Sequence, residues 1–317
     1  MTPAMVREAA HRIKPLTKRT PVLTSRGADS LAGASVFFKC ENFQRGGSFK
    51  IRGASNLILS LDRSQLERGV VAFSSGNHAQ ATAIAARHVG TQATIVMPLD
   101  APRSKVEATR DFGATIVTYD RLREDRERIA AGILAATGGT LVPPYDHELI
   151  IAGQGTCALE LLEETGPLDA LVVCLGGGGL CSGSAVIAHD LYPSLPVFGV
   201  EPERANDWHL SMQAGHRVEI GPPETIADGL RSPIPGRLTF SILQHQLEKV
   251  VLVTEEEIRR AMSFLLGRMK ILVEPSGAVA AAALLSGKIP RTFARIGVIL
   301  SGGNVDLDLL ADGMLIS

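Results

Sequence analysis

From residue 69 onward, short runs of β-branched residues alternate with amphipathic stretches of helical spacing. This alternation is typical of βαβ units, in which parallel strands form one sheet and helices cover its faces. This alternation predicts a small α/β domain over residues 69–146, and the pattern restarts after Pro143 and Pro144 in a large domain made of residues 1–68 and 147–317. Expected strands are 36–39, 70–73, 93–97, 114–117, 140–142, 170–175, 197–200 and 297–301; expected helices are 49–61, 78–88, 103–112, 123–136, 155–164, 182–189, 255–266 and 276–285.

We therefore predict two open, twisted α/β domains with mainly parallel sheets and a ligand in the cleft between them. Ligands of such sheets bind at the carboxyl ends of the strands. The residues that follow the predicted strands are thus the first candidates for a functional site.

Composition excludes several classes of function. The 32 Lys and Arg residues balance 33 Asp and Glu residues, and no basic cluster suits a nucleic acid. The longest strongly apolar stretch, Ala278–Leu285, is too short to cross a membrane, and the N-terminus shows no leader pattern. Four scattered cysteines favour neither a disulfide framework nor zinc. We expect a cytoplasmic protein without nucleic-acid or membrane partners.

Four consecutive glycines, Gly176–Gly179, stand between a predicted strand and a predicted helix. Without Cβ atoms, their N–H groups can converge on an anion at the helix N-terminus, and a phosphate is the expected guest. The alternative is a turn with a purely structural role. The dinucleotide fingerprint fails in every register of this loop, and Gly287-Lys288 lacks the residues of a P-loop.

Lys50 lies at the start of a predicted helix, within the segment Arg45–Arg52. Ser48 is the expected N-cap, so Lys50 falls in the first turn, where the helix dipole and the two arginines disfavour an ammonium. A lysine with a lowered pKa suits covalent attachment or proton abstraction. The alternative is a solvated lysine in a cationic patch.

Two polar turns follow other strands. Ser74, Ser75, Asn77 and His78 provide hydroxyl, amide and imidazole groups suited to binding a carboxylate or phenolate oxygen, although ordinary helix capping would use the same residue types. Ser301 ends the last predicted strand, where its hydroxyl could meet a ring nitrogen.

The sequence gives weaker support to other kinds of function. Gly179–Gly183 resembles a nucleophile elbow, which would make Cys181 the nucleophile of a thiol hydrolase. A non-catalytic sensor of a phosphate ligand would keep the glycines but would not need Lys50. His147-Glu148 lacks the second histidine of a zinc helix.

Seven motifs, in the same order, resemble the fold-type II pyridoxal-phosphate enzymes, and within them the serine/threonine dehydratase and serine racemase group. Ile51 follows the lysine where the sulfhydrylase and threonine synthase branches usually carry an acidic residue, which favours the dehydratase branch. The motifs are Glu41–Ala54, Ser74–Gln80, Ile151–Thr156, Leu175–Leu180, Pro223–Gly229, Glu274–Pro275 and Ser301–Asp306.

The resemblance implies a pyridoxal-phosphate-dependent ammonia-lyase. Its substrate would be a β-hydroxy amino acid such as threonine, serine, 3-hydroxyaspartate or phenylserine, and its products a 2-oxo acid and ammonia. Lys50 would carry the cofactor and act as the base at Cα. The alternative is an amino-acid racemase, acting on serine or hydroxyaspartate, in which Lys50 and Ser75 are the bases on the two faces.

The same resemblance implies roles for further residues. A neutral Ser301 hydroxyl does not hold the ring nitrogen protonated, which favours elimination over transamination. Arg126 could equally be one more charge on a solvated helix. The implied cofactor contacts are Phe49, Lys50, Asn77, Gly176, Gly177, Gly178, Gly179, Leu180, Glu274 and Ser301, and the implied substrate contacts are Ser74, Ser75, Asn77, His78, Arg126 and Ser232.

Three further expectations come from the resemblance. Glu201, the Ala205 carbonyl and Asp207 would bind magnesium or calcium through oxygen ligands, unless they form a plain acidic loop. Gly46 stands where the family usually has a threonine, which predicts a roomier pocket. The chain ends soon after Ser301, so a C-terminal regulatory domain is not expected, and relatives suggest a homodimer.

Overall fold

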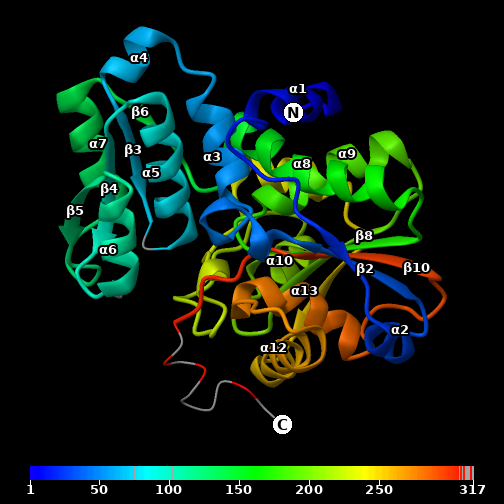
Figure 1. The fold of residues 1–317 in the computed structure, drawn as a ribbon. Coiled ribbons are helices and arrows are strands. Elements are labelled where there is room, and N and C mark those ends of the chain that lie inside the picture. Colours follow the sequence, from blue (N-terminus) through cyan, green and yellow to red (C-terminus); the bar gives the residue numbers. More distant parts are fainter. Residues whose placement is uncertain (75, 102, 307, 309, 311–314, 316–317) are drawn as a thin grey trace.

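The computed structural model describes residues 1–74, 76–101, 103–306, 308, 310 and 315, and it contains two sheets (Figure 1). Apart from β1 with β2, all neighbouring strands pair in parallel, which confirms the predicted fold class. In spatial order, the larger sheet is β1 (Val22–Leu23), β2 (Ser35–Cys40), β10 (Arg295–Leu300), β7 (Ala170–Cys174), β8 (Val197–Pro202) and β9 (Lys249–Val253), and the smaller is β5 (Thr115–Tyr119), β4 (Ala93–Pro98), β3 (Val70–Phe73) and β6 (Thr140–Leu141).

Helices cover both faces of the larger sheet. α8 and α9 pack on one face, and α2 and α13 on the other, with α12 against α13 (Figure 1). No helix within the described ranges is both long and apolar enough to cross a bilayer. The helices are α1 (Pro3–Ile13), α2 (Arg26–Ala32), α3 (Lys50–Ile58), α4 (Arg63–Glu67), α5 (Asn77–Val89), α6 (Arg103–Asp111), α7 (Arg126–Thr137), α8 (Glu148–Thr165), α9 (Gly179–Leu191), α10 (Asp207–Ala214), α11 (Arg237–Leu243), α12 (Glu255–Met269) and α13 (Pro275–Leu285).

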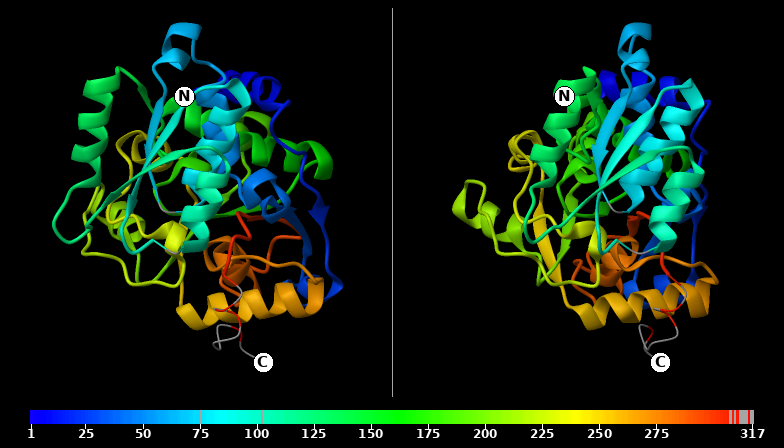
Figure 2. Two further views of the ribbon diagram at one scale, coloured as in Figure 1. Left: turned by 60° about the vertical axis from the view of Figure 1, so that its left-hand side comes forward. Right: turned by 90° about the vertical axis from the view of Figure 1, so that its left-hand side faces the viewer.

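Helices flank the smaller sheet on both sides (Figure 2), and its central strands β3 and β4 are largely buried on both faces. Val70 and Ala72 pack with α5 and α3 on one side, whereas Val71 packs with Ala130 of α7 on the other. Successive residues of a strand point to opposite faces, so burial of both faces requires an apolar run without alternation. The domain boundaries expected from the sequence stay a prediction.

Each expected strand and helix is present, but some ends differ, and the sequence prediction missed the edge strands β1 and β9 and the helices α1, α2, α4, α10 and α11. The largest difference is α8, which begins at Glu148 rather than at residue 155. Two glycines near the expected start lie inside this helix: a Cβ on Gly153 would lie 2.4 Å from the Arg52 carbonyl oxygen, and one on Gly155 would lie 2.7 Å from that of Gly183. These glycines permit close helix crossings, a tertiary reason that the local sequence does not reveal.

Candidate active site

A cavity of about 210 Å³ lies where strands of both sheets end. It is bordered by residues that follow β3, β7 and β10, as expected for ligands of parallel sheets. Ser75 lies outside the described residues. The structure brings the other predicted cofactor and substrate residues together in the cavity wall: Phe49, Lys50, Ser74, Asn77, His78, Arg126, Gly176, Gly177, Gly178, Gly179, Leu180, Ser232, Glu274 and Ser301.

Neighbouring groups occupy the space beside the glycine loop, Gly176–Gly179. A Cβ on Gly177 would lie 2.2 Å from the Tyr145 ring, and one on Gly179 would lie 2.4 Å from Gln154 Oε1. Gly178 has a φ of +96°, a conformation that residues with side chains rarely adopt. The four glycines are therefore required by their neighbours and do not indicate a flexible turn.

Unsatisfied polar groups surround the same loop. α9 begins at Gly179, so the N–H groups of its first turn have no acceptor within the helix. The Gln154 side chain is buried beside Gly179, and neither its Oε1 nor its Nε2 has a hydrogen-bond partner among the described residues. Buried polar groups are normally paired, so these groups indicate a site for a ligand with several acceptor oxygens.

Lys50 is the first residue of α3, and its Nζ donates to the Pro144 carbonyl at 2.9 Å. Burial lowers the pKa of Lys50 to about 8, although Cys174 and Glu274 act in the opposite direction. The sequence predicted that the helix dipole and the two arginines would lower this pKa, whereas in the structure burial lowers it. The predicted Ser48 cap is also wrong: Phe49 occupies the N-cap, and Ser48 forms a β-bridge with Gly302.

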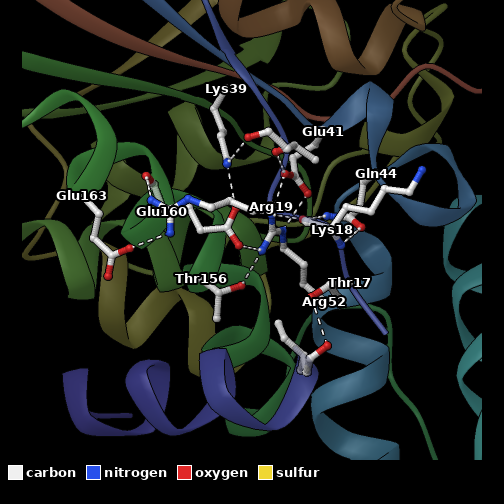
Figure 3. A network of polar contacts seen from close by, with 12 residues as sticks. Thr17, Lys18, Arg19, Lys39, Glu41, Gln44, Arg52, Thr156, Glu160 and Glu163 are labelled. Atoms are coloured by element: carbon white, nitrogen blue, oxygen red, sulfur yellow. Dashed lines mark hydrogen bonds and ion pairs between the residues drawn. The ribbon is translucent and has the colours of Figure 1, made fainter. Parts of the chain in front are cut away.

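A buried ion network anchors the helix that carries Lys50 (Figure 3). Arg52 donates to both carboxylate oxygens of Glu41, at 2.7 and 2.8 Å, and to both of Glu160, at 2.8 Å. Lys39 donates to Glu160 at 2.7 Å, so two cations face two anions. Burial tends to raise the pKa of Glu41, but the charge and hydrogen bonds of Arg52, together with Lys39 and Thr20, hold that pKa below its usual value. The network joins β2, α3 and α8 at a point two residues from Lys50.

Asn77 is held between two partners at the cavity wall. Its Nδ2 donates to Glu274 Oε1 at 2.6 Å, and its Oδ1 accepts from Asn304 Nδ2 at 2.8 Å. Asn304 also donates to the Gly46 carbonyl at 2.7 Å. Gly46 has a φ of +72°, and a Cβ there would lie 3.0 Å from the Ile84 side chain. The glycine thus fits a left-handed turn that a threonine would strain.

His78 presents a neutral ring to the cavity. Its Nε2 lies 2.8 Å from the Val142 carbonyl oxygen, which can only accept, so Nε2 carries the proton. Burial, and then the nearby Lys50, lower the pKa of His78 to about 3. Nδ1 is buried and has no partner within the described part of the chain, so an acceptor is available there.

The far part of the wall contains Arg126, whose guanidinium lies over the Phe73 ring at 5.2 Å from its centroid. Arg126 is exposed as well as part of the cavity wall, so its substrate-side role stays a prediction beside the alternative of a solvated helix charge. Ser232 donates to the Ile234 carbonyl at 2.8 Å, so the Tyr145 hydroxyl, 3.3 Å away, donates to Ser232.

Glu201 and Asp207 lie outside this cavity and are fully buried. Glu201 accepts from the Trp208 and His209 N–H groups, at 3.3 and 2.8 Å, whereas both side-chain oxygens of Asp207 have no partner among the residues described. Burial, and then the charge of Asp207, raises the pKa of Glu201, and burial raises that of Asp207 to about 8. A buried carboxylate with two unpartnered oxygens, Asp207, beside a second buried carboxylate, Glu201, matches the oxygen donors of a hard divalent cation.

The hypothesis of a Cys181 nucleophile is wrong. Cys181 lies inside α9 with no exposed surface, and burial raises the pKa of its thiol far from neutral pH. A buried thiol of this kind is inert.

Sequence reasoning missed several residues of the cavity wall, including Tyr145, Gln154 and Arg231. Gln154 was part of a recognised motif but received no role. Tyr145 lies three residues after the predicted strand 140–142, beyond Pro143-Pro144, and received no role. Asn304, which orients Asn77, belongs to the last motif and was equally unassigned.

Comparison with known proteins agrees with this geometry. A family model described as "Pyridoxal-phosphate dependent enzyme" matches residues 13–302. An L-threo-3-hydroxyaspartate ammonia-lyase from a Pseudomonas species is 51% identical over 96% of this chain and 95% of its own, and the serine racemase of Schizosaccharomyces pombe is 49% identical over the same shares. The structure of maize serine racemase superposes with a TM-score of 0.95 at 42% identity, covering 99% of this chain and 96% of that one.

Proposed function

Because the chain belongs to the family of pyridoxal-phosphate-dependent enzymes, we propose that it is an ammonia-lyase that eliminates water from a β-hydroxy amino acid and yields a 2-oxo acid and ammonia. The observation that carries the proposal is the Lys50 amine, whose lowered pKa makes it available as a base, in the same cavity as the glycine loop. Similar proteins named for hydroxyaspartate ammonia-lyase and threonine deaminase activity support this reaction class.

The residues of the cavity fit pyridoxal phosphate. The unsatisfied N–H groups at the start of α9 and the unpartnered Gln154 amide suit a phosphate. We assign the phosphate to Gly176, Gly177, Gly178, Gly179 and Leu180, the ring face to Phe49, the 3-oxygen to Asn77 with Glu274 behind it, and the ring nitrogen to Ser301. When bound, the cofactor supplies the electron sink that stabilises negative charge at Cα.

The chain's own residues then move the protons. Lys50 takes the proton from Cα, and its ammonium returns one to the departing β-hydroxyl, so that water leaves. Ser74 and Asn77 supply donors for the substrate carboxylate. His78 is neutral at the pH of the reaction because burial lowers its pKa, and its free Nδ1 can only accept, so it would face a donor group of the substrate and not the carboxylate. Ser301 is a neutral partner and leaves less charge delocalised into the ring, which favours elimination.

For the substrate, we place 3-hydroxyaspartate before threonine, serine and phenylserine. Arg126 lines the cavity, and a guanidinium there suits a second carboxylate, which among these four only hydroxyaspartate carries. The names of several similar proteins point to the same substrate.

A racemase is the second candidate, because other equally similar proteins are named serine racemase. In that reaction Lys50 and Ser75 would serve the two faces of Cα. Ser75→Ala should remove racemisation while leaving more of the elimination from the L-substrate; equal racemisation by this variant would refute the two-base assignment.

We further propose that Glu201, Asp207 and the Ala205 carbonyl hold magnesium or calcium. The unpartnered Asp207 oxygens support this assignment, and a cation would offset two buried negative charges. After chelation, added magnesium should raise the melting temperature of the wild type and not that of Asp207→Asn. A cytoplasmic location and a homodimer also remain proposals; the four cysteines are buried and unpaired, which agrees with a reducing compartment.

The principal test uses purified protein and a panel of β-hydroxy amino acids of both configurations, with oxo acid and enantiomer measured together. The wild type should take up pyridoxal phosphate with a yellow colour, and Lys50→Ala should form no oxo acid. A protein that takes up none of the cofactor would overturn the proposed function.

A further inference from the structure

Trp208 is the single tryptophan of the chain, and it is fully buried as the second residue of α10. Its backbone N–H donates to Glu201, and the preceding residue is Asp207. Its indole Nε1–H donates to the Gly176 carbonyl of the glycine loop. One residue therefore connects the two buried carboxylates, through its backbone, with the first glycine of the loop, through its indole.

The Trp208 ring also sets the shape of the loop. A Cβ on Gly178 would lie 2.5 Å from Trp208 Cζ2 and 2.8 Å from Thr239 Cβ. Thr239 fixes the next carbonyl, since its hydroxyl donates to Gly177 O at 2.7 Å. The carbonyls of Gly176 and Gly177 are thus held from the side of α10 and α11, which determines where the N–H groups of the loop point.

We propose that Trp208 is a positioning residue that couples the cation site, Glu201 and Asp207, to the glycine loop that would bind the phosphate. A divalent cation on Glu201 and Asp207 draws two like charges together and fixes the first turn of α10. The indole follows that turn and holds Gly176 and Gly178 in the conformation that receives a phosphate. The coupling rests on the proposed cofactor and cation sites, and it is reciprocal: the cation raises the affinity for pyridoxal phosphate by the same factor as the cofactor raises the affinity for the cation.

A simpler role is packing alone, because the Trp208 ring also contacts Phe240, with 5.9 Å between centroids. Trp208→Phe distinguishes the two roles, since it keeps an aromatic ring but removes the hydrogen bond to Gly176. Phe240→Leu is the matched control: it loosens the same packing from the side of α11 without removing a donor to the loop.

The experiment measures both affinities in apo-protein freed of cofactor and metal. Pyridoxal phosphate is titrated by absorbance with and without saturating magnesium, and magnesium is titrated by calorimetry with and without the cofactor. In the wild type we expect each ligand to raise the affinity for the other by about 5- to 20-fold, within the usual range of coupling between sites. In Trp208→Phe both ligands should still bind, but neither should change the affinity for the other, so the coupling factor should be near 1. Phe240→Leu should keep the wild-type coupling factor.

Fluorescence of the wild type gives an independent readout, because Trp208 is the only indole. Magnesium should shift its emission in the apo-protein, and it should not do so in Asp207→Asn. The inference is overturned if Trp208→Phe retains the wild-type factor, or if calorimetry detects magnesium binding that leaves the emission unchanged. These results differ from a failure of the proposed function, in which the wild type would take up no pyridoxal phosphate and form no oxo acid.

Discussion

Gly177→Ala tests whether the glycine loop is shaped by its neighbours. The added Cβ would lie 2.2 Å from Tyr145 Cδ1, with two more ring atoms at 2.3 Å. Ordinary contact begins near 3.4 Å, so the ring or the loop must move by about 1.2 Å. Overpacking of this kind costs about 1–3 kcal/mol. The cost should appear as a lower urea midpoint of the apo-protein, together with weaker uptake of pyridoxal phosphate.

A double-mutant cycle assigns this cost to the ring. In a Tyr145→Ala background the ring is absent, so Gly177→Ala should cost less than about 0.5 kcal/mol, and the coupling energy should approach the whole cost of the single change. Gly178→Ala is the contrasting variant. Its φ of +96° strains any residue with a side chain, and its Cβ would also lie 2.5 Å from Trp208 Cζ2. A cost of at least about 1–2 kcal/mol should therefore persist with or without Tyr145.

The assay is urea unfolding of the four proteins of the cycle and of the Gly178→Ala pair, with cofactor uptake followed by absorbance in the same samples. If Gly177→Ala costs the same in both backgrounds, the steric explanation of the loop is refuted. Backbone flexibility would then be the reason for the glycines.

Three further predictions use the same unfolding measurement. In the folded protein the pKa of Lys50 is about 8, below its usual value of 10.5, so between pH 8 and 10.5 the unfolded chain binds more protons than the folded one. The free energy of unfolding of the apo-protein should therefore rise over that interval by up to about 3 kcal/mol. Lys50→Met should remove this rise. The pKa of His78 is also lowered, to about 3, so the free energy of unfolding should fall as the pH drops from 6.5 towards 3, and it should fall less steeply in His78→Gln. Parallel curves of stability against pH for the two proteins would contradict the lowered pKa of His78. Arg52→Leu leaves the buried Glu41 without its cation and Glu160 with Lys39 alone, so it should cost about 3–5 kcal/mol. Arg19→Leu, which breaks an exposed ion pair, should cost less than about 1 kcal/mol; equal costs would show that the buried network is not needed.

Much of the fold follows from local sequence. Apolar runs separated by helical stretches predicted the parallel strands, because a strand buried on both faces requires such a run. The edge strands were missed since β1 has two residues and β9 follows a stretch of turns. The start of α8 was misplaced because Gly153 and Gly155 resemble helix breakers, whereas their function is to let α3 and α9 approach closely.

For the site, the sequence determined which segments matter, because a lysine at a helix start and four glycines between a strand and a helix are recognisable from residue types alone. Only the tertiary structure decided how they work. Burial is a property of the whole packed chain, and it is burial that lowers the pKa of Lys50. The neighbours that fill the space beside the glycines come from distant segments, Tyr145 before α8 and Trp208 on α10, so no local pattern could have assigned them to the loop.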